Sequence, residues 1–261
     1  MLRLVLTPSL GGEFALWEKP TERGQYIVSC DPSLGRVTSE KSDTSCIGVW
    51  LRMPGSRLRQ VAEVVFRWSG GRVGEVCAAM ARRAGGYLDP KNAKERNCAI
   101  INIERNLCDV PLAYILEQQA FPDEYLFIPR QDRDLLLEQG VKRFFTPKTQ
   151  ANQDYLLNNL VDYLDRDALE IRSKETLDEL RTLSKDRNGR VDTNGKDRAV
   201  MVLMACAADR ELGPVDYTDM AWEEQKEKKK PEYGRVPADV PPPKKSRVPH
   251  RVGWQPWNGQ G

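Results

Sequence analysis

Short apolar runs separated by polar connections occupy the first half of the chain. The runs cover residues 26–30, 44–51, 60–66, 98–103 and 125–129. Each has the length and the content of Val, Ile, Phe or Tyr that are typical of a β-strand, and the Met-Pro-Gly-Ser sequence at 53–56 predicts a hairpin loop between the second and third runs. A further apolar stretch at 14–17 is expected to form a strand or an arm packed on the same domain.

Helical periodicity appears between and after these runs. Within residues 71–86, apolar side chains recur at helical spacing until a pair of glycines ends the pattern. A second helix is predicted from 109 or 110 to 119, and another begins at Asp197, where small and apolar residues follow one another. Three meandering strands followed by alternating helices and strands predict a mixed sheet with helices on both faces.

Two acidic residues stand directly after buried runs. Asp31 follows the first run and Glu104 follows the fourth. Asp31 is interpreted either as a turn residue before Pro32 or as the anchor of a metal site. If the two strands are neighbours in the sheet, Asp31 and Glu104 face each other at one edge, where buried carboxylates repel unless a cation or a proton lies between them.

A third acid is expected at the same place. Asp197 stands in the first turn of a helix whose small residues allow it to lie close to the sheet, and a helix start favours a negative group. Asp192 is the alternative, but it lies in a Gly- and Asn-containing loop where Asp is common for turn geometry alone. We therefore expect Asp31, Glu104 and Asp197 to converge, and carboxylate oxygens of this kind bind Mg²⁺ or Mn²⁺ rather than zinc.

The charge is unevenly distributed along the chain. From Glu223 onward there are nine Lys/Arg, five Asp/Glu and seven of the seventeen prolines. This part therefore carries a charge of about +4, the rest of the chain about −2, and the whole chain +2. Such a composition cannot bury enough apolar surface to fold. We therefore predict a folded domain over residues 1–222 and a disordered basic tail over 223–261, which acts either as a solvated linker or as an electrostatic arm for DNA or a partner.

The cysteines and the single histidine exclude some chemistry. The six cysteines form no C-x-x-C pair and His250 is the only histidine, so a zinc site and a histidine general base are not expected. The thiols are typical of an intracellular protein. The sequence shows no signal peptide and no apolar stretch long enough to span a bilayer, which predicts a soluble protein of the cytoplasm without membrane contact.

Several segments, in their order and spacing, resemble the nuclease domain of the large terminase subunit of tailed bacteriophages. The matching segments are Asp-Pro-Ser-Leu-Gly at 31–35, Ser-Asp-Thr-Ser at 42–45, Glu-Arg-Asn at 104–106, Phe-Phe-Thr-Pro-Lys-Thr at 144–149, and the I-x-S-x-x-T-x-x-E-L rhythm within 169–180. The resemblance covers roughly residues 14–210. One difference concerns the last acid, which usually forms part of an acidic pair, whereas here Asp197 follows Lys196.

The resemblance implies a fold and a function. The fold is α/β, a ribonuclease H-like mixed five-stranded sheet flanked by helices. The function is that of a metal-dependent endonuclease that cuts double-stranded DNA with little sequence preference in viral DNA packaging, using two Mg²⁺ or Mn²⁺ ions. Asp31 is expected to bridge the ions, with Glu104 and Asp197 holding one ion each. The protein is expected to act in the host cytoplasm.

Other residues are expected to support this site. Asp43 is an auxiliary candidate, although a turn residue before the second strand is the favoured interpretation. Arg105, Lys148 and Lys196 are candidates for contacts with DNA phosphates. The implied partners are double-stranded DNA, the terminase ATPase motor, the small terminase subunit and the portal.

One feature of large terminases does not occur in this sequence. The G-x-x-x-x-G-K-[ST] phosphate-binding loop of an ATPase motor occurs nowhere in the chain. We therefore expect a nuclease domain belonging to a longer protein or the product of a split gene, unable to translocate DNA alone. Two alternatives stay open: another ribonuclease H-like nuclease (an integrase, transposase or junction resolvase), and a binding module that keeps the fold without the activity.

Overall fold

A computed structural model describes the chain over residues 13–21, 24–33, 44–67, 70–84, 98–104, 110–129, 150–185, 191–193 and 195–215. These residues belong to one compact unit, Met1–Thr218. Three predicted site residues, Asp43, Arg105 and Lys148, lie outside the described residues, as do the Thr-Pro-Lys-Thr segment and the tail over 223–261, so the domain boundary stays a prediction.

The centre of the unit is a mixed β-sheet of six strands. The strands are β1 (Glu13–Leu16), β2 (Gln25–Asp31), β3 (Ser45–Met53), β4 (Arg57–Phe66), β5 (Ile100–Ile103) and β6 (Leu169–Glu170). Their order is β1-β4-β3-β2-β5, with β6 on the β4 strand. The β2, β3 and β4 strands form an antiparallel meander, and β5 runs parallel to β2. The first and fourth apolar runs are therefore neighbours, which is the condition under which Asp31 and Glu104 were expected to face each other.

The predicted fifth strand is shorter than expected. Leu126 makes a single parallel bridge to Ile101, and the rest of 125–129 is not paired as a strand. A short 3-10 turn (η4, Asp123–Tyr125) immediately precedes it, and Pro129 has no N–H to donate, which leaves little room for a longer ladder. The sheet reaches six strands because β1 and β6 both pair with β4.

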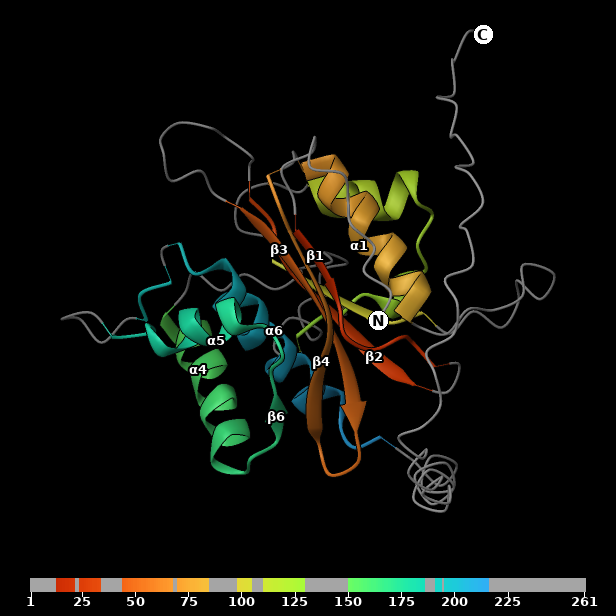
Figure 1. Ribbon diagram of the computed structural model, residues 1–261. Coiled ribbons are helices and arrows are strands. Elements are labelled where there is room, and N and C mark those ends of the chain that lie inside the picture. The colour runs from red at the N-terminus through yellow and green to blue at the C-terminus, as the bar shows by residue number, and fades with distance from the viewer. Residues whose placement is uncertain are drawn as a thin grey trace, which may run out of the picture. The chain divides into compact units, whose positions relative to one another are not determined.

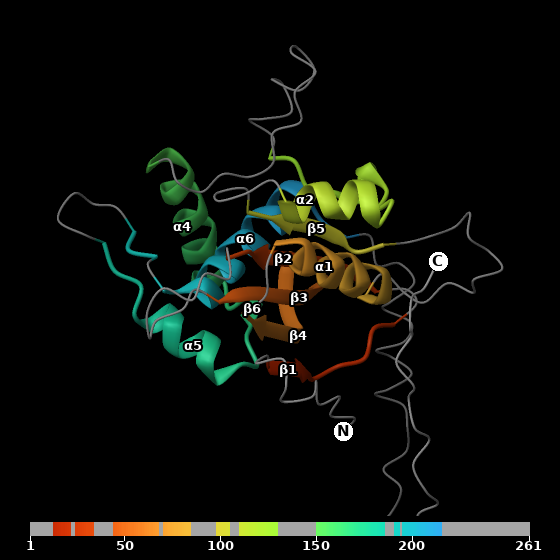
Figure 2. The same ribbon diagram turned by 90° about the horizontal axis from the view of Figure 1, so that it is seen from above.

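Helices cover both faces of the sheet. They are α1 (Gly70–Ala84), α2 (Val110–Ala113), which continues as the π-helix η3 (Tyr114–Gln118), α4 (Gln150–Asp165), α5 (Lys174–Arg181) and α6 (Asp197–Leu212). In Figures 1 and 2, α1 and α2 lie on one face, whereas α6 lies on the other face with α4 and α5 beside it. The architecture is therefore α/β, a mixed sheet flanked by helices on both faces, as the sequence predicts.

The two-residue period of the strands divides the apolar residues between two cores. Tyr26, Val28 and Cys30 of β2 point to the core under α1, whereas Ile27 points to the core under α6. All nine residues of β3 are buried, because this central strand is covered on both faces.

The α6 helix lies very close to the sheet. A Cβ at Gly48 of β3 would clash with the Met201 Sδ of α6, so any larger residue there would require the Met201 side chain to move. Although α6 is almost entirely buried, no helix among the described residues combines the length and the apolar character that a membrane crossing requires.

The far end of α6 is fixed to the sheet by a buried ion pair. The Arg52 Nε of β3 donates a 2.5 Å hydrogen bond to the Asp209 Oδ1 of α6. The other Asp209 oxygen accepts a 2.5 Å hydrogen bond from the Tyr163 hydroxyl of α4, and Arg52 also donates to the Gly213 carbonyl at the helix end. Both charged side chains are satisfied by several partners, as burial requires.

Candidate active site

Strand parity places the first two predicted acids on the face covered by α6. In β2, Ile27 faces the core under α6, so Asp31, four residues later, points the same way. In β5, the Asn102 side chain donates to the Met204 carbonyl of α6 at 2.9 Å, and Glu104 lies two residues further along. The Glu104 N–H continues the parallel ladder by donating to the Cys30 carbonyl at 3.0 Å.

Asp31 and Glu104 meet at the carboxyl ends of these parallel strands. The two carboxyl groups are close enough that Glu104 perturbs the ionisation of Asp31. Burial raises the pKa of Asp31 well above its usual range, and the negative charge of Glu104 raises it further, followed by those of Asp197 and Glu179. Four carboxylates therefore influence one another at this edge of the sheet.

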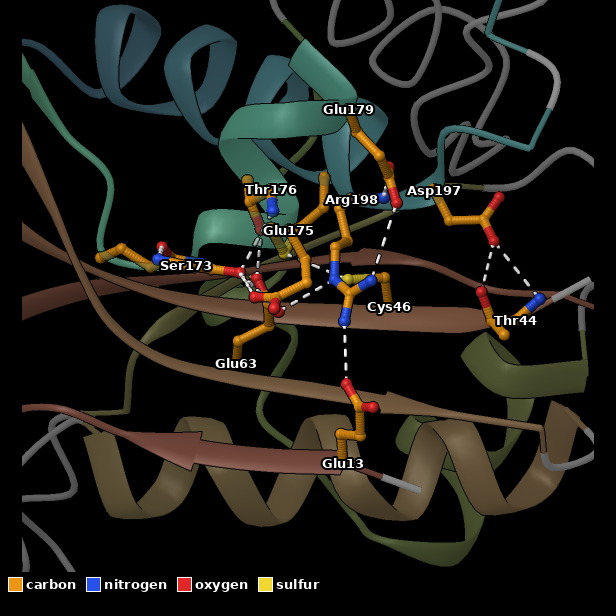
Figure 3. Close-up of polar contacts among 12 residues, drawn as sticks. Glu13, Thr44, Cys46, Glu63, Ser173, Glu175, Thr176, Glu179, Asp197 and Arg198 are labelled. Carbon is orange, nitrogen blue, oxygen red and sulfur yellow. Dashed lines mark hydrogen bonds and ion pairs between the residues drawn. The ribbon is translucent and has the colours of Figure 1, made fainter. Parts of the chain in front are cut away.

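Asp197 begins α6, as the sequence predicts, and is held by the residue before β3. The Thr44 hydroxyl donates to the Asp197 Oδ2 at 2.7 Å, and the Thr44 N–H points to the same oxygen at 3.3 Å (Figure 3). Thr44 immediately precedes β3, whose Cys46 pairs with Asp31 across the sheet. The third acid is thus tied to the strand that neighbours the first acid.

The donor chemistry suits a hard divalent cation, but the ligand set is not complete in the structure. Asp31 and Glu104 offer carboxylate oxygens whose mutual repulsion a cation would relieve. Within the described ranges, no group of three or more His, Cys, Asp or Glu side chains lies close enough together to hold an ion. The structure therefore brings Asp31 and Glu104 together, and it places Asp197 within electrostatic reach but outside a shared ligand cluster.

A fourth acid, Glu179 of α5, contacts the beginning of α6. Its Oε2 accepts hydrogen bonds from the Arg198 N–H at 2.9 Å and from the Ala199 N–H at 3.2 Å. Burial raises the pKa of Glu179, although the two N–H groups and the Arg198 charge act in the opposite direction. In Figure 3, Glu179 reaches toward the beginning of α6, where Asp197 and Arg198 stand.

A buried ion pair lies beside this contact. The Arg198 Nε donates to the Glu63 Oε1 of β4 at 3.0 Å, and its other nitrogens reach Glu13 at 3.1 Å and Glu179 at 3.8 Å. Glu63 also accepts hydrogen bonds from Ser173 and Thr176 of the α5 segment and from its neighbour Gln60. These are 3.1, 2.5 and 2.8 Å long, respectively. The guanidinium thus joins the sheet, α5 and α6 (Figure 3).

Glu63 and Arg198 were not among the residues predicted from the sequence. A glutamate in the middle of an apolar strand such as 60–66 is itself a signal, because a buried charge needs a partner. Its partner is 135 positions away, and nothing in the local sequence identifies it.

The Lys196 side chain makes hydrogen bonds within the protein. Its Nζ donates to the carbonyl oxygens of Thr182 and Asp192, both at 2.9 Å, and it lies 3.5 Å from the Asp192 carboxylate. Only 12% of the Lys196 side chain is exposed. This geometry holds the loop before α6 in place, whereas the contact of Lys196 with DNA stays a prediction.

Comparisons with known proteins give likenesses of fold. No family model and no curated protein matches the sequence. The chain is similar to the large terminase nuclease domain of Thermus phage P74-26, at 14% identity and a TM-score of 0.45, over 75% of this chain and 83% of that one. It is also similar to the yeast mitochondrial Holliday junction resolvase Ydc2, at 15% identity and a TM-score of 0.33, over 74% and 81% of the two chains.

A third similar structure is the large terminase of bacteriophage HK97. The identity is 12% and the TM-score is 0.33, over 76% of this chain and 44% of that one. Phage large terminases, the class that the sequence motifs resemble, are thus among the similar folds. At these identities the likeness is one of fold alone.

Proposed function

We propose that this chain is a metal-dependent endonuclease that cuts double-stranded DNA with little sequence preference, as the nuclease part of a viral DNA-packaging terminase. The observation that carries the proposal is the Asp31–Glu104 carboxyl pair at the ends of adjacent parallel strands, with Asp197 at the start of the covering helix. Glu104 is buried and Asp31 partly buried, and acids that raise the cost of each other's charge in this way concentrate at functional sites.

Each acid has its own task in this proposal. Asp31 and Glu104 would hold Mg²⁺ or Mn²⁺ ions through their carboxylates, with Asp197 as a further ligand. When bound, the ions supply an activated water and neutralise the charge on the phosphodiester. The chain's contribution is to hold the three acids on rigid elements, because two of them end strands and the third begins a buried helix.

The proposed substrate and partners follow from the same interpretation. The acids contact no base edges in this scheme, so selectivity for sequence is not expected and backbone contacts dominate binding. Arg105, Lys148 and Lys196 are the proposed phosphate contacts. The proposed partners are the terminase ATPase motor, the small terminase subunit and the portal, which would act in the host cytoplasm.

Plasmid nicking tests the proposal directly. Supercoiled plasmid is incubated with the chain in Mg²⁺, in Mn²⁺ or in EDTA, beside Asp31→Asn and, as a matched control, the exposed Asp192→Asn. We expect open-circular and linear products with either metal for the wild type and the control, and none in EDTA or with Asp31→Asn. Undiminished cutting in EDTA would contradict the metal mechanism, whereas a strong preference for a four-way junction over linear duplex would favour the junction-resolvase alternative.

A further inference from the structure

The segment over 171–180 carries a Ser-x-x-Thr-x-x-Glu spacing that the proposed reaction does not use. Ser173 precedes α5 and caps it, accepting the Thr176 N–H at 3.2 Å. The hydroxyl groups of both residues donate to Glu63 of β4, at 3.1 and 2.5 Å. Ser173 and Thr176 are fully or almost fully buried, so the first turn of α5 is fixed to the sheet.

Glu179 stands one turn further along the same helix. Thr176 and Glu179 are three residues apart and therefore lie on neighbouring positions of one helix face. While Thr176 contacts the sheet, the Glu179 carboxylate accepts the N–H groups of Arg198 and Ala199 at 2.9 and 3.2 Å. The three-residue spacing thus connects β4 to the start of α6 through a single turn of α5.

The start of α6 needs such a partner. The first N–H groups of a helix have no acceptor within the helix, and a side chain at the N-cap usually supplies one. Here the N-cap residue is Lys196, whose side chain makes no capping hydrogen bond. Glu179 therefore supplies the missing cap from another helix, on the residues that directly follow Asp197.

We propose that Glu179 is a positioning residue, which caps α6 from α5 and thereby sets Asp197 opposite the Asp31–Glu104 pair. The inference rests on the proposed function, because it gives Asp197 a role at the metals. It also explains why Asp197 can act without an adjacent acid: Thr44 holds its carboxylate, while Glu179 holds the backbone of its helix turn. The Arg198 guanidinium compensates the negative charges of Glu63 and Glu179, which lie 3.0 and 3.8 Å from it.

Three substitutions separate the cap from the charge. Glu179→Gln keeps an oxygen acceptor at the same reach and removes the charge, Glu179→Asp keeps the charge and withdraws the acceptor by one methylene, and Glu179→Ala removes both. Asp178→Asn is the matched control, because Asp178 is a neighbouring acid that pairs with Lys174 and Arg181 at the surface. For each variant, the cleavage kinetics, the Mn²⁺ dissociation constant by calorimetry and the unfolding temperature are measured.

If Glu179 acts as a cap, the variants should rank in a particular order of cleavage rate and Mn²⁺ affinity. Glu179→Gln and Asp178→Asn should keep wild-type cleavage and Mn²⁺ affinity. Glu179→Asp and Glu179→Ala should lower kcat by about tenfold to a hundredfold, the loss expected when a catalytic group is displaced, with an unchanged KM for DNA and weaker Mn²⁺ binding. Glu179→Asp is a small change, so it keeps the test decisive if Glu179→Ala does not fold.

Other rankings of the variants in kcat and Mn²⁺ affinity would overturn the proposal. Wild-type kcat and Mn²⁺ affinity in folded Glu179→Asp would show that the cap does not position Asp197, and loss in Glu179→Gln with retention in Glu179→Asp would assign the effect to charge instead. If the wild type binds Mn²⁺ but cuts no DNA, the proposed function fails, while the same order in Mn²⁺ affinity still decides the role of Glu179. If the wild type binds no Mn²⁺, both proposals fail.

Discussion

Thr44 and Asp197 lie 153 positions apart in the chain and share a 2.7 Å hydrogen bond from the threonine hydroxyl to the carboxylate Oδ2. The Thr44 N–H lies 3.3 Å from the same oxygen. The contact joins the beginning of β3 to the beginning of α6. In the Ser-Asp-Thr-Ser segment, the sequence analysis selected Asp43 as an auxiliary candidate. The structure shows that Thr44 of the same segment contacts the candidate site.

The first prediction concerns this contact. Thr44→Ala should lower the rate of plasmid nicking by about tenfold or more, because a hydrogen bond to a charged group contributes about 1.5–3 kcal/mol. Thr44→Ser keeps the hydroxyl and should retain most of the activity. Equal nicking rates for Thr44→Ala and the wild type would show that Asp197 is held adequately without this bond.

The second prediction distinguishes two acids before α6. Asp197→Asn should abolish cleavage and weaken Mn²⁺ binding, because Asp197 stands on a buried helix. Asp192→Asn should retain most of the activity, because the Asp192 side chain is 46% exposed and contacts Lys196. Nicking assays and Mn²⁺ calorimetry on the two variants decide the matter, and the reverse pattern would place the loop at the metals.

The third prediction is a pH-dependent gain of stability in Asp31→Asn. Because the folded-state pKa of Asp31 is raised, the folded state holds more protons than the unfolded state above the ordinary carboxyl pKa of about 4, and stability falls as pH rises through this window. In EDTA, Asp31→Asn should therefore unfold at a higher temperature than the wild type at pH 7–8, and the difference should disappear near pH 4.

Thermal unfolding followed by circular dichroism checks this prediction. A gain of 1 kcal/mol corresponds to about 2–4 °C in a domain of this size. Asp192→Asn, measured in parallel, should show no such gain. A lower unfolding temperature for Asp31→Asn at pH 8 would mean that Asp31 stabilises the metal-free fold, against the repulsion described above.

The fourth prediction concerns the ion pair between β4 and α6. The Arg198 side chain is 16% exposed and that of Glu63 is 6% exposed. Arg198→Met should lower the free energy of unfolding by about 3 kcal/mol, because it leaves a buried carboxylate without its cation. Arg181→Met, at a position that is 74% exposed, should change it by less than about 0.5 kcal/mol. Urea unfolding of both variants measures the difference, and equal values would show that Ser173, Thr176 and Gln60 satisfy Glu63 alone.

The fifth prediction concerns the basic tail. Removal of residues 223–261 should leave cooperative unfolding and Mn²⁺ binding unchanged. If the tail binds DNA, its removal should also reduce the dependence of DNA affinity on salt concentration, in proportion to the number of phosphates that the tail neutralises. An unchanged salt dependence would restrict the tail to a linker or to docking on a protein, and loss of cooperative unfolding would show that it packs on the domain.

Local sequence patterns predicted the main elements because their causes are local. Apolar runs predicted β2 to β5, helical spacing predicted α1, and the small residues after Asp197 predicted α6 with its first residue correct. The meeting of Asp31 and Glu104 was expected on the condition that their strands are neighbours, and the structure shows these strands paired in parallel. The strand expected over 125–129 was wrong in extent, since Leu126 alone is paired.

The supports of the site could not be predicted in the same way. Thr44, Glu63 and Glu179 act through partners that only the tertiary structure brings near. The hydrogen bond from Ser173 to Glu63, for example, spans 110 positions. A threonine before a strand and a glutamate on a helix have many ordinary uses, so their side chains reveal a role only once the packing of α5 and α6 on the sheet is known.

The fixation of α6 at both of its ends has a consequence for the interpretation of mutational screens. Asp209, near the far end, is bound to Arg52 and Tyr163, and Asp197, at the near end, is bound to Thr44. The two acids are about 18 Å apart along the helix axis. Since a well-packed helix moves as one body, loss of Arg52 would displace Asp197 without touching any group near it. Inactive variants recovered at Arg52 or Asp209 would therefore report on the alignment of this helix, and they would not indicate a second place of chemistry.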